Sequence, residues 1–263
     1  MATSPDPPFT RIRYLPTDEA YDRWAPVYDT DGNFLQALDS LAMEALLPRF
    51  LASISSPRPW RIVDLGCGTG RNTAALLARS SSDAQIVALD ASRGMLAVAR
   101  ARLASGSPSP HFELFDLLDE ATGPPAAALG ADAAISTLVV EHVPLGVFFR
   151  QAARVVRRGG VLLLTNMHEE MGAVSQAGFV DARTGEKIRP RGSYAHAAAE
   201  VVAEARRWGF EVLGSSDALE ERAVVDDGTM VQRLGERSRK WVGVRCWYGG
   251  IFRKVRDEEP VAG

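Results

Sequence analysis

Residues 63–70 read VDLGCGTG, a short apolar run that passes into three glycines at alternate positions. A buried strand that feeds a glycine turn and then a helix aims backbone N–H groups and the positive end of the helix dipole at one point. The stretch therefore predicts a turn that binds a nucleotide-type group at the end of a strand. Taken alone, it does not say which group binds there.

The spacing of the glycines excludes two common nucleotide turns. A dinucleotide fingerprint, G-x-G-x-x-G, that starts at Gly66 needs a glycine at the position where this chain has Arg71. The third glycine, Gly70, comes one residue early, so the pyrophosphate cradle is mis-spaced. A Walker loop is also excluded, because no Gly-Lys-Ser/Thr sequence follows.

Short β-rich runs alternate with helical ones from Arg61 onward. They read RIVDL, NTAALLAR, QIVAL, SRGMLAVARARL, HFELF, DAAISTLVV, PLGVFFRQAARVVRR and GVLLLTN. Strands that alternate with helices form βαβ units, and their sheet is parallel and covered on both faces. The rhythm breaks over residues 167–194, which is too long for an ordinary connection. Two final strands, FEVLGSS and WVGVRCWYGGIFRKV, flank a charged segment that looks helical.

The observed spacing is D-x-G-x-G-x-G, with Asp64, Gly66, Gly68 and Gly70 at the fixed positions. It matches the first motif of class I S-adenosylmethionine (SAM)-dependent methyltransferases, which this chain resembles. VALDAS, HFELFD, DAAISTLVVEHV and RRGGVLLLTN then follow that family's order of motifs. YDRWAPVYD resembles a stretch found before the first strand in ubiquinone/menaquinone-type small-molecule methyltransferases (methyltransferase type 11/25). A weaker resemblance connects the chain with fungal secondary-metabolite methyltransferases.

The resemblance implies an α/β fold with a Rossmann-like seven-stranded sheet, mostly parallel with an antiparallel last strand, and helices on both faces. We expect a disordered arm over residues 1–16, which hold four prolines and no periodicity. A single methyltransferase domain would occupy residues 17–263. Within it, residues 17–55 would form an N-terminal helical cover and residues 167–194 a lid insertion.

The resemblance also implies which residues bind SAM. The glycines would let the backbone approach the methionine half, and Asp90, at the end of the next strand, would accept hydrogen bonds from the ribose hydroxyls. Asp116 would hold the adenine amino group, and the cofactor would leave as S-adenosylhomocysteine (SAH). The expected cofactor residues are Tyr28, Asp64, Gly66, Cys67, Gly68, Gly70, Asp90, Ala91, Met95, Asp116, Leu117 and Thr137, with Ser136 and Leu138 nearby.

Two histidines follow strand ends where an acceptor would lie, His142 and His168. Methyl transfer from a sulfonium is an in-line displacement, so alignment matters most. Either histidine could act as a general base for a hydroxyl acceptor, whereas a thiol or an amine would need little beyond positioning. A histidine that only caps its strand end is an equally open reading of His142. His168-Glu169-Glu170 lacks the second histidine of a zinc helix, so we expect no metal.

Composition limits the partners. The 263 residues carry a formal net charge of −3 and two cysteines. No cationic field favours nucleic acid or anionic lipid, and two cysteines do not make a disulfide scaffold. The sequence shows neither an apolar signal segment at its start nor an apolar run long enough to span a membrane. We expect a cytoplasmic protein, monomeric or homodimeric, without nucleic-acid or membrane partners.

The acceptor pocket is expected to be apolar and to admit a small hydrophobic metabolite. Its walls would come from Phe179, Tyr194, Trp241, Trp247 and Tyr248, although any of these could be core. In the insertion, FVDARTGEKI is typical of a hairpin. Two other functions stay open. A non-catalytic SAM-binding or regulatory protein would have a filled acceptor cavity, and the early third glycine disfavours an NAD-dependent oxidoreductase.

Overall fold

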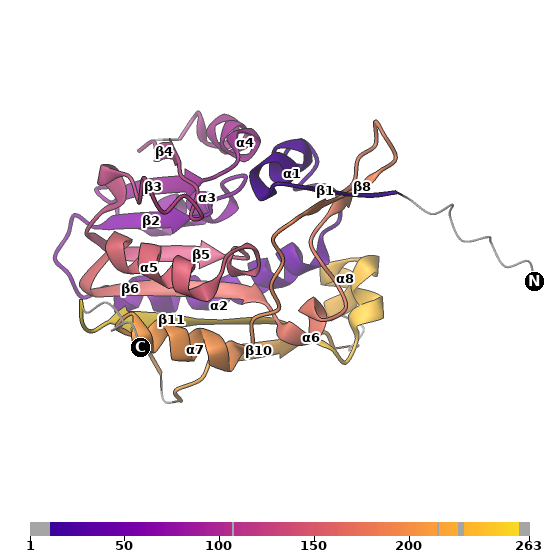
Figure 1. Cartoon of the computed structure of the whole chain (residues 1–263). Coiled ribbons are helices and arrows are strands. Elements are labelled where there is room, and N and C mark those ends of the chain that lie inside the picture. The colour runs from indigo at the N-terminus through magenta and orange to yellow at the C-terminus, as the bar shows by residue number, and fades with distance from the viewer. Residues whose placement is uncertain (1–10, 107, 215, 226–228, 258–263) are drawn as a thin grey trace, which may run out of the picture.

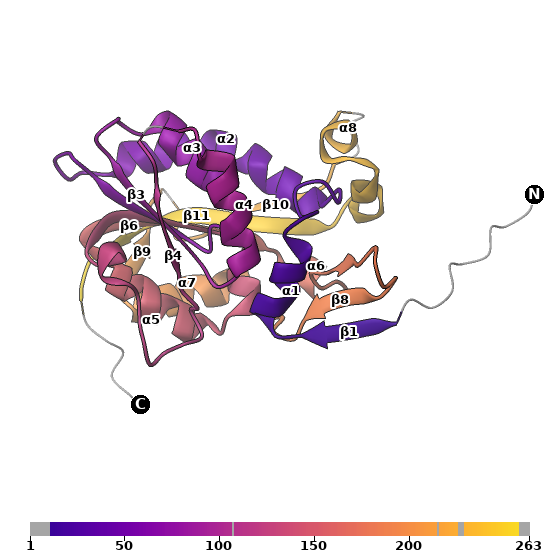
Figure 2. The same cartoon turned by 90° about the horizontal axis from the view of Figure 1, so that it is seen from above.

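The computed structural model describes residues 11–106, 108–214, 216–225 and 229–257. An eight-stranded sheet runs through the centre, with helices on both faces (Figure 1; Figure 2). The order is β10-β11-β6-β5-β2-β3-β4, and β9 also pairs with β11. The strands are β2 (Arg61–Leu65), β3 (Gln85–Asp90), β4 (His111–Leu114), β5 (Ala131–Thr137), β6 (Val156–Met167), β9 (Phe210–Val212), β10 (Glu220–Ala223) and β11 (Arg245–Lys254).

Strands β4, β3, β2, β5 and β6 are parallel, and β11 runs antiparallel to β6. The expected mostly parallel Rossmann-like sheet with an antiparallel last strand is therefore confirmed. The count of seven strands is one too low, because β10 (EERA) pairs with β11 inside the segment that we expected to be helical. Charged side chains are usual on an edge strand, so no apolar alternation marks it in the sequence.

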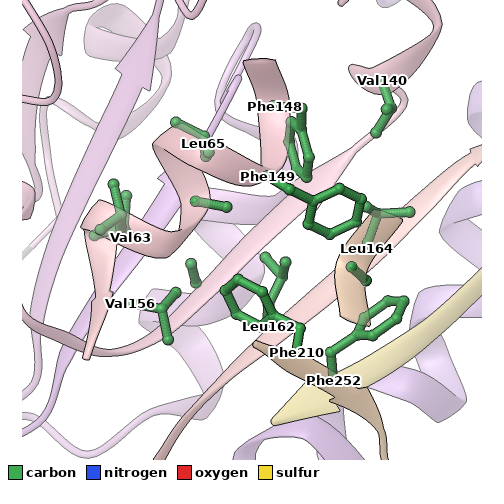
Figure 3. Packing of buried hydrophobic residues seen from close by; sticks show 14 of the residues in the cluster. Val63, Leu65, Val140, Phe148, Phe149, Val156, Leu162, Leu164, Phe210 and Phe252 are labelled. Carbon is green, nitrogen blue, oxygen red and sulfur yellow. The ribbon is translucent and has the colours of Figure 1, made fainter. Parts of the chain in front are cut away.

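The helices cover both faces of this sheet. They are α1 (Thr17–Trp24), α2 (Phe34–Ser53), α3 (Arg71–Arg79), α4 (Arg93–Leu103), α5 (Leu145–Val155), α6 (Glu169–Gly172), α7 (Ala198–Arg207) and α8 (Met230–Leu234), with the 3-10 turns η1 (Ala126–Ala128), η2 (Val140–His142) and η3 (Glu236–Trp241). Helices α2, α3 and α4 lie on one face and α5 and α7 on the other (Figure 2). Phe148 and Phe149 of α5 pack with Phe210 of β9 and Phe252 of β11 (Figure 3).

A second, three-stranded sheet joins the N-terminal segment to the insertion (Figure 1). β1 (Ile12–Leu15) pairs in parallel with β8 (Lys187–Pro190), which pairs antiparallel with β7 (Phe179–Val180). The expected hairpin is confirmed. The expected disordered arm is wrong for residues 11–16, because β1 takes its hydrogen bonds from a strand far along the chain, which local sequence does not signal. Residues 1–10 lie outside the described residues.

Helix α1 begins at Thr17, where the helical patterning predicts it. It packs against both α4 and β8, so it joins the second sheet to the carboxyl edge of the central sheet (Figure 2). Among the described residues, no helix is both long and apolar enough to cross a bilayer.

Candidate active site

A cavity of about 360 Å³ opens at the carboxyl ends of β2, β3 and β5, beside the loop after β4; we call it the first cavity. Backbone and side chains from the strand ends form its floor, while α1 and the end of the insertion form its cover. The expected site residues that line it are Tyr28, Gly66, Gly68, Asp90, Ala91, Met95, Asp116, Leu117, Thr137, Leu138 and His142. The structure therefore brings most of the predicted set together.

The glycine turn is held tightly between its neighbours. Gly66 has φ +82°, and a Cβ built on it would lie 2.3 Å from Cγ2 of Val139. The N–H groups of Gly66 and Cys67 both donate to the carbonyl of Leu89, each at 2.8 Å. Gly66 is thus required for close packing of the turn against the segment after β5. A Cβ on Gly68, by contrast, would meet no atom within 4 Å.

Asp90 connects the end of β3 to this turn. Its Oδ2 accepts the N–H of Gly68 at 2.7 Å, and its Oδ1 accepts the N–H of Ser92 at 2.8 Å. Burial raises the pKa of the Asp90 carboxyl to about 6, although these backbone donors favour the charged form. Each oxygen keeps acceptor capacity, so the carboxylate can take two further donors from the cavity that it lines.

Three predicted cofactor residues do not line the first cavity. Asp64 is fully buried, and its Oδ2 accepts the hydroxyl of Thr73 at 2.6 Å. Burial raises the pKa of the Asp64 carboxyl to about 7. Gly70 packs against α4, where an added Cβ would lie 3.1 Å from that of Ala99. Cys67 lines only a small neighbouring recess under the turn. The structure assigns Asp64 and Gly70 to support of the turn.

Two aspartates dock the N-terminal segment onto the cavity. Asp22 Oδ1 accepts the hydroxyl of Ser92 at 2.6 Å and the N–H of Gly94 at 2.7 Å. Asp29 Oδ1 accepts the hydroxyl of Thr69, in the glycine turn, at 2.9 Å. These are the two aspartates of YDRWAPVYD, so the stretch fastens α1 and the turn after it to the loops of β2 and β3. From this stretch the sequence predicted a role for Tyr28 and none for the two aspartates.

Tyr21 and His142 form a hydrogen-bonded pair in the first cavity. The Tyr21 hydroxyl lies 2.7 Å from Nε2 of His142, and Nδ1 of His142 lies 3.1 Å from the carbonyl oxygen of Gly192. Because a carbonyl can only accept, Nδ1 carries the proton and Nε2 of the neutral ring accepts from Tyr21. Burial raises the pKa of Tyr21 well above its ordinary value, so this hydroxyl stays protonated.

Glu141 lies beside this pair. Its Oε1 is 3.4 Å from Nε2 of His142, and its Oε2 is buried without a hydrogen-bond partner among the described residues. Burial favours neutral imidazole, but the hydrogen bond and charge of Glu141 and the carbonyl of Gly192 outweigh it, so the pKa of His142 is raised. The pair and the carboxylate make a buried proton-accepting group.

A second cavity, of about 510 Å³, adjoins the first, and Tyr21, Tyr28 and Leu138 line both. Leu138 has φ +57°, which is rare for a leucine and costs conformational energy. That strain lies where the cavities meet, as expected of a functional site. A filled acceptor cavity, the sign of a non-catalytic SAM-binding protein, is not what the structure shows.

Several predicted acceptor-side residues lie elsewhere. His168 is fully buried, caps α6 by accepting the N–H of Glu170 at Nδ1, and lines neither cavity. Trp247 and Tyr248 are fully buried core residues of β11, so both expectations are corrected. Of the other aromatic residues, Tyr194 lines the first cavity, and Phe179 and Trp241 line the second.

Sequence comparison finds methyltransferases. A family model described as a methyltransferase domain matches residues 62–160. The chain is 49% identical over 263 residues to an uncharacterized methyltransferase of Emericella nidulans, with 91% of each chain covered. A trans-aconitate 2-methyltransferase of Methylobacterium nodulans is 40% identical over 112 residues, which are 43% of this chain and 40% of that protein.

Solved structures of the same fold accompany these relatives. The DhpI-SAH complex has a TM-score of 0.59 at 20% identity, with 90% of this chain and 94% of that chain covered. A SAM-dependent methyltransferase of Mesorhizobium loti has a TM-score of 0.55 at 23% identity, covering 78% and 96%. The [4+2]-cyclase SpnF has a TM-score of 0.57 at 18% identity, covering 96% and 100%. At such identities the likeness concerns the fold alone.

Proposed function

The chain belongs to the family of SAM-dependent methyltransferases, and from that premise we propose that it methylates a small hydrophobic metabolite at the place where its two cavities meet. The observation that carries the proposal is the hydrogen bond of 2.7 Å between Tyr21 and His142, which both line the first cavity. This pair can take the proton of a substrate hydroxyl that is to be methylated at that place.

The residues of the first cavity fit SAM. Asp90 has acceptor capacity for two vicinal ribose hydroxyls, and the open space beside Gly68 admits a group close to the backbone. Asp116, after β4, also lines this cavity, and we propose that it meets the adenine amino group. When bound, SAM supplies an electrophilic methyl group on a sulfonium that loses its charge as the methyl leaves.

The proposed proton path runs through Tyr21 to His142. An acceptor hydroxyl that donates to the Tyr21 oxygen loses its proton to that oxygen, while the Tyr21 proton passes to Nε2 of His142. Atoms and charge balance: the neutral imidazole becomes an imidazolium, Tyr21 ends neutral, and the acceptor oxygen keeps the electron pair of its O–H bond, with which it would form the new bond to the methyl carbon. The carboxylate of Glu141, 3.4 Å from Nε2, stabilises the resulting charge. General-base assistance of this kind is worth about 10²- to 10⁴-fold in rate.

Size and charge support a metabolite as the acceptor. Cavities of about 360 and 510 Å³ suit small molecules, and the net charge of −3 does not favour a nucleic-acid backbone. We propose a role in cytoplasmic small-molecule metabolism, as a monomer or homodimer. The weaker resemblance to fungal secondary-metabolite methyltransferases supports secondary metabolism as its setting.

The test combines binding and turnover. Calorimetry should show binding of SAM and SAH but not NAD, and a metabolite library incubated with SAM should yield a product heavier by one methyl group. His142→Asn should then lower turnover of that acceptor by about 10²- to 10⁴-fold while SAH binding persists. His111→Asn, an exposed histidine on β4 paired with Glu113, is the matched control. Unchanged turnover in His142→Asn would remove His142 as the base.

A further inference from the structure

The second cavity has a lining that the cofactor site does not explain. It lies between the start of α2, the insertion and η3, and it shares Tyr21, Tyr28 and Leu138 with the first cavity. Its contents would therefore meet the first cavity where the proposed proton acceptor lies. The three parts of its wall differ in chemistry along the length of the cavity.

The inner end is polar and lacks a partner. Glu141 lines this cavity with a side chain that is only 6% exposed, and its Oε2 has no hydrogen-bond partner among the described residues. A buried carboxylate oxygen without a donor is costly, so it favours a ligand that brings a hydroxyl or amine N–H to this point. Tyr21, whose hydroxyl contacts His142, lies at the same end.

The walls are apolar and aromatic. Phe34 stacks on Trp241 with ring centroids 5.8 Å apart, and Phe179 stacks on Trp24 at 5.3 Å. Met167 and Met171 also line the cavity; Met171 lies in α6 of the insertion. Stacked rings and thioethers form a surface for a flat or branched apolar body.

The outer end carries positive charge. Lys187, Arg237 and Lys240 line the cavity and make no ion pair with any residue that the structure describes; the ammonium of Lys240 lies over the Trp241 ring, 5.1 Å from its centroid. Burial lowers the pKa of Lys187, and the nearby positive charges of Arg189 and Lys240 lower it further. Like charges held together without a counterion favour an anion between them.

The acidic residues of this lining are already engaged. Asp31 accepts the indole N–H of Trp24 at 2.7 Å and the N–H of Asn33 at 3.0 Å. Glu236 pairs with Arg239 at 2.6 Å. Glu141 lies at the inner end. None of these three carboxylates forms an ion pair with Lys187 or Lys240 among the residues that the structure describes.

From this gradient we propose that the second cavity is the acceptor site and that its occupant is an amphipathic organic acid. Its anionic group faces Lys187 and Lys240, and its apolar body lies between the stacked aromatic residues. The hydroxyl to be methylated donates to Tyr21, and a second hydroxyl or an amine N–H beside it donates to Glu141. This assignment of a substrate class rests on the proposed function. The binding of an anion at the outer end does not depend on the proposed function.

A pair of fluorescent probes tests the charge preference. The full chain, saturated with SAH, is titrated with 8-anilinonaphthalene-1-sulfonate and with its uncharged counterpart N-phenyl-1-naphthylamine. The sulfonate should bind the wild type about tenfold more tightly, a difference of ~1.4 kcal/mol. The double variant Lys187→Gln/Lys240→Gln should lose this preference and keep its affinity for the neutral probe.

Matched variants locate the probe. Arg183→Gln removes a cation from the tip of the same insertion, where the side chain is 82% exposed, and should change nothing. Energy transfer from tryptophan to the bound sulfonate should fall in Trp241→Phe. It should persist in Trp60→Phe, a position outside the lining of this cavity.

Each outcome decides one statement. Equal affinity of the two probes for the wild type, or a sulfonate preference that survives in the double variant, overturns the proposal. Failure of the wild type to bind SAH in calorimetry, with the sulfonate preference intact, overturns the proposed function and the acceptor assignment but supports the anion site.

Discussion

The two cavities share a boundary but are built in different ways. The first is lined largely by residues within a few positions of the ends of β2, β3, β4 and β5, and its central contacts are backbone N–H groups on Asp90. The second assembles residues as far apart in the chain as Asp31 and Trp241, and its walls are packed side chains. One site depends on strand ends, the other on tertiary packing.

This difference separates cofactor from acceptor. Strand ends of a parallel sheet meet at one edge whatever loops follow, so a site built on them keeps its geometry. A cavity between an insertion, a helix start and a C-terminal turn changes with each of those segments. We therefore expect mutations to fall into three classes: those that affect the shared frame, those confined to the first cavity and those confined to the place where the cavities meet.

The largest effect is expected from Asp39→Ala, in the shared frame. Asp39 is fully buried in α2, and its oxygens accept from Arg71 at 2.6 Å, Thr165 at 2.6 Å and Trp247 at 2.9 Å. Removal leaves buried donors unpaired on three elements, which should lower the free energy of unfolding by about 3–5 kcal/mol. Urea unfolding followed by tryptophan fluorescence measures it.

The matched control for Asp39 is Glu44→Ala. Glu44 lies on the same helix with a 63% exposed side chain, and its ion pair among the described residues is a long contact to Arg233 at 3.6 Å. Its loss should cost about 0.5 kcal/mol or less. Equal losses in the two variants would show that the buried contacts of Asp39 do not hold α2 to the sheet.

The central fold was predictable where local pattern and packing agree. The run RIVDL is buried on both faces as β2, and its neighbours along the chain alternate with helices in the same way. β1 and β10 were not predictable, because four-residue strands with exposed or charged side chains owe their existence to partners far along the chain. Helix α5 ends at Val155, earlier than the run suggests, because Val156 already pairs with β5.

A smaller effect, confined to the first cavity, is expected from Asp90→Ala. Two charge-assisted hydrogen bonds to the ribose would be lost together with the support of Gly68, so SAH affinity should fall about 100-fold, or ~2.7 kcal/mol. Calorimetry measures the loss. Binding of the sulfonate probe to the second cavity should stay unchanged, which also reports that the variant folds.

The control for Asp90 is Asp119→Ala. Asp119 lies on the loop after β4, outside the lining of the first cavity, and among the described residues its carboxylate accepts from Ala121 and Thr122 of that loop. The Asp119→Ala variant should bind SAH with the affinity of the wild type. A lower affinity of the Asp90→Ala variant for the sulfonate probe would contradict the view that the two cavities are built independently.

The candidate site was predictable for residues fixed by strand ends and not for those fixed by packing. Asp90 and Asp116 follow from their positions after β3 and β4. His142 and His168 follow strand ends alike; only the structure separates the one that lines the cavity from the one that caps α6. The sequence around Glu141 gives no sign of its role, because an acidic residue next to a histidine on a 3-10 turn is usually exposed to solvent.

The smallest effect concerns pH and the place where the cavities meet. The base is neutral His142, so turnover should rise with pH through the pKa of His142 in the enzyme. Because the carboxylate of Glu141 and the carbonyl of Gly192 raise that pKa, the midpoint should lie above the ordinary imidazole value of about 6.5. Glu141→Gln keeps the shape but removes the charge, so its midpoint should fall below that of the wild type. Rate profiles against pH measure both.

The raised pKa of His142 also makes the stability of the protein depend on pH. A pKa raised by folding means that protonated His142 is favoured in the native state, so the contribution from Glu141 is fully present below the unfolded pKa of about 6.5 and is lost as pH rises through the native pKa. Glu141→Gln should therefore cost more stability at acidic pH than at alkaline pH. Its effect on turnover should be smallest at low pH, because there the wild-type histidine is protonated and cannot act as a base. Identical pH midpoints in the two enzymes would mean that Glu141 does not control His142. Its free oxygen would then be left to the acceptor alone.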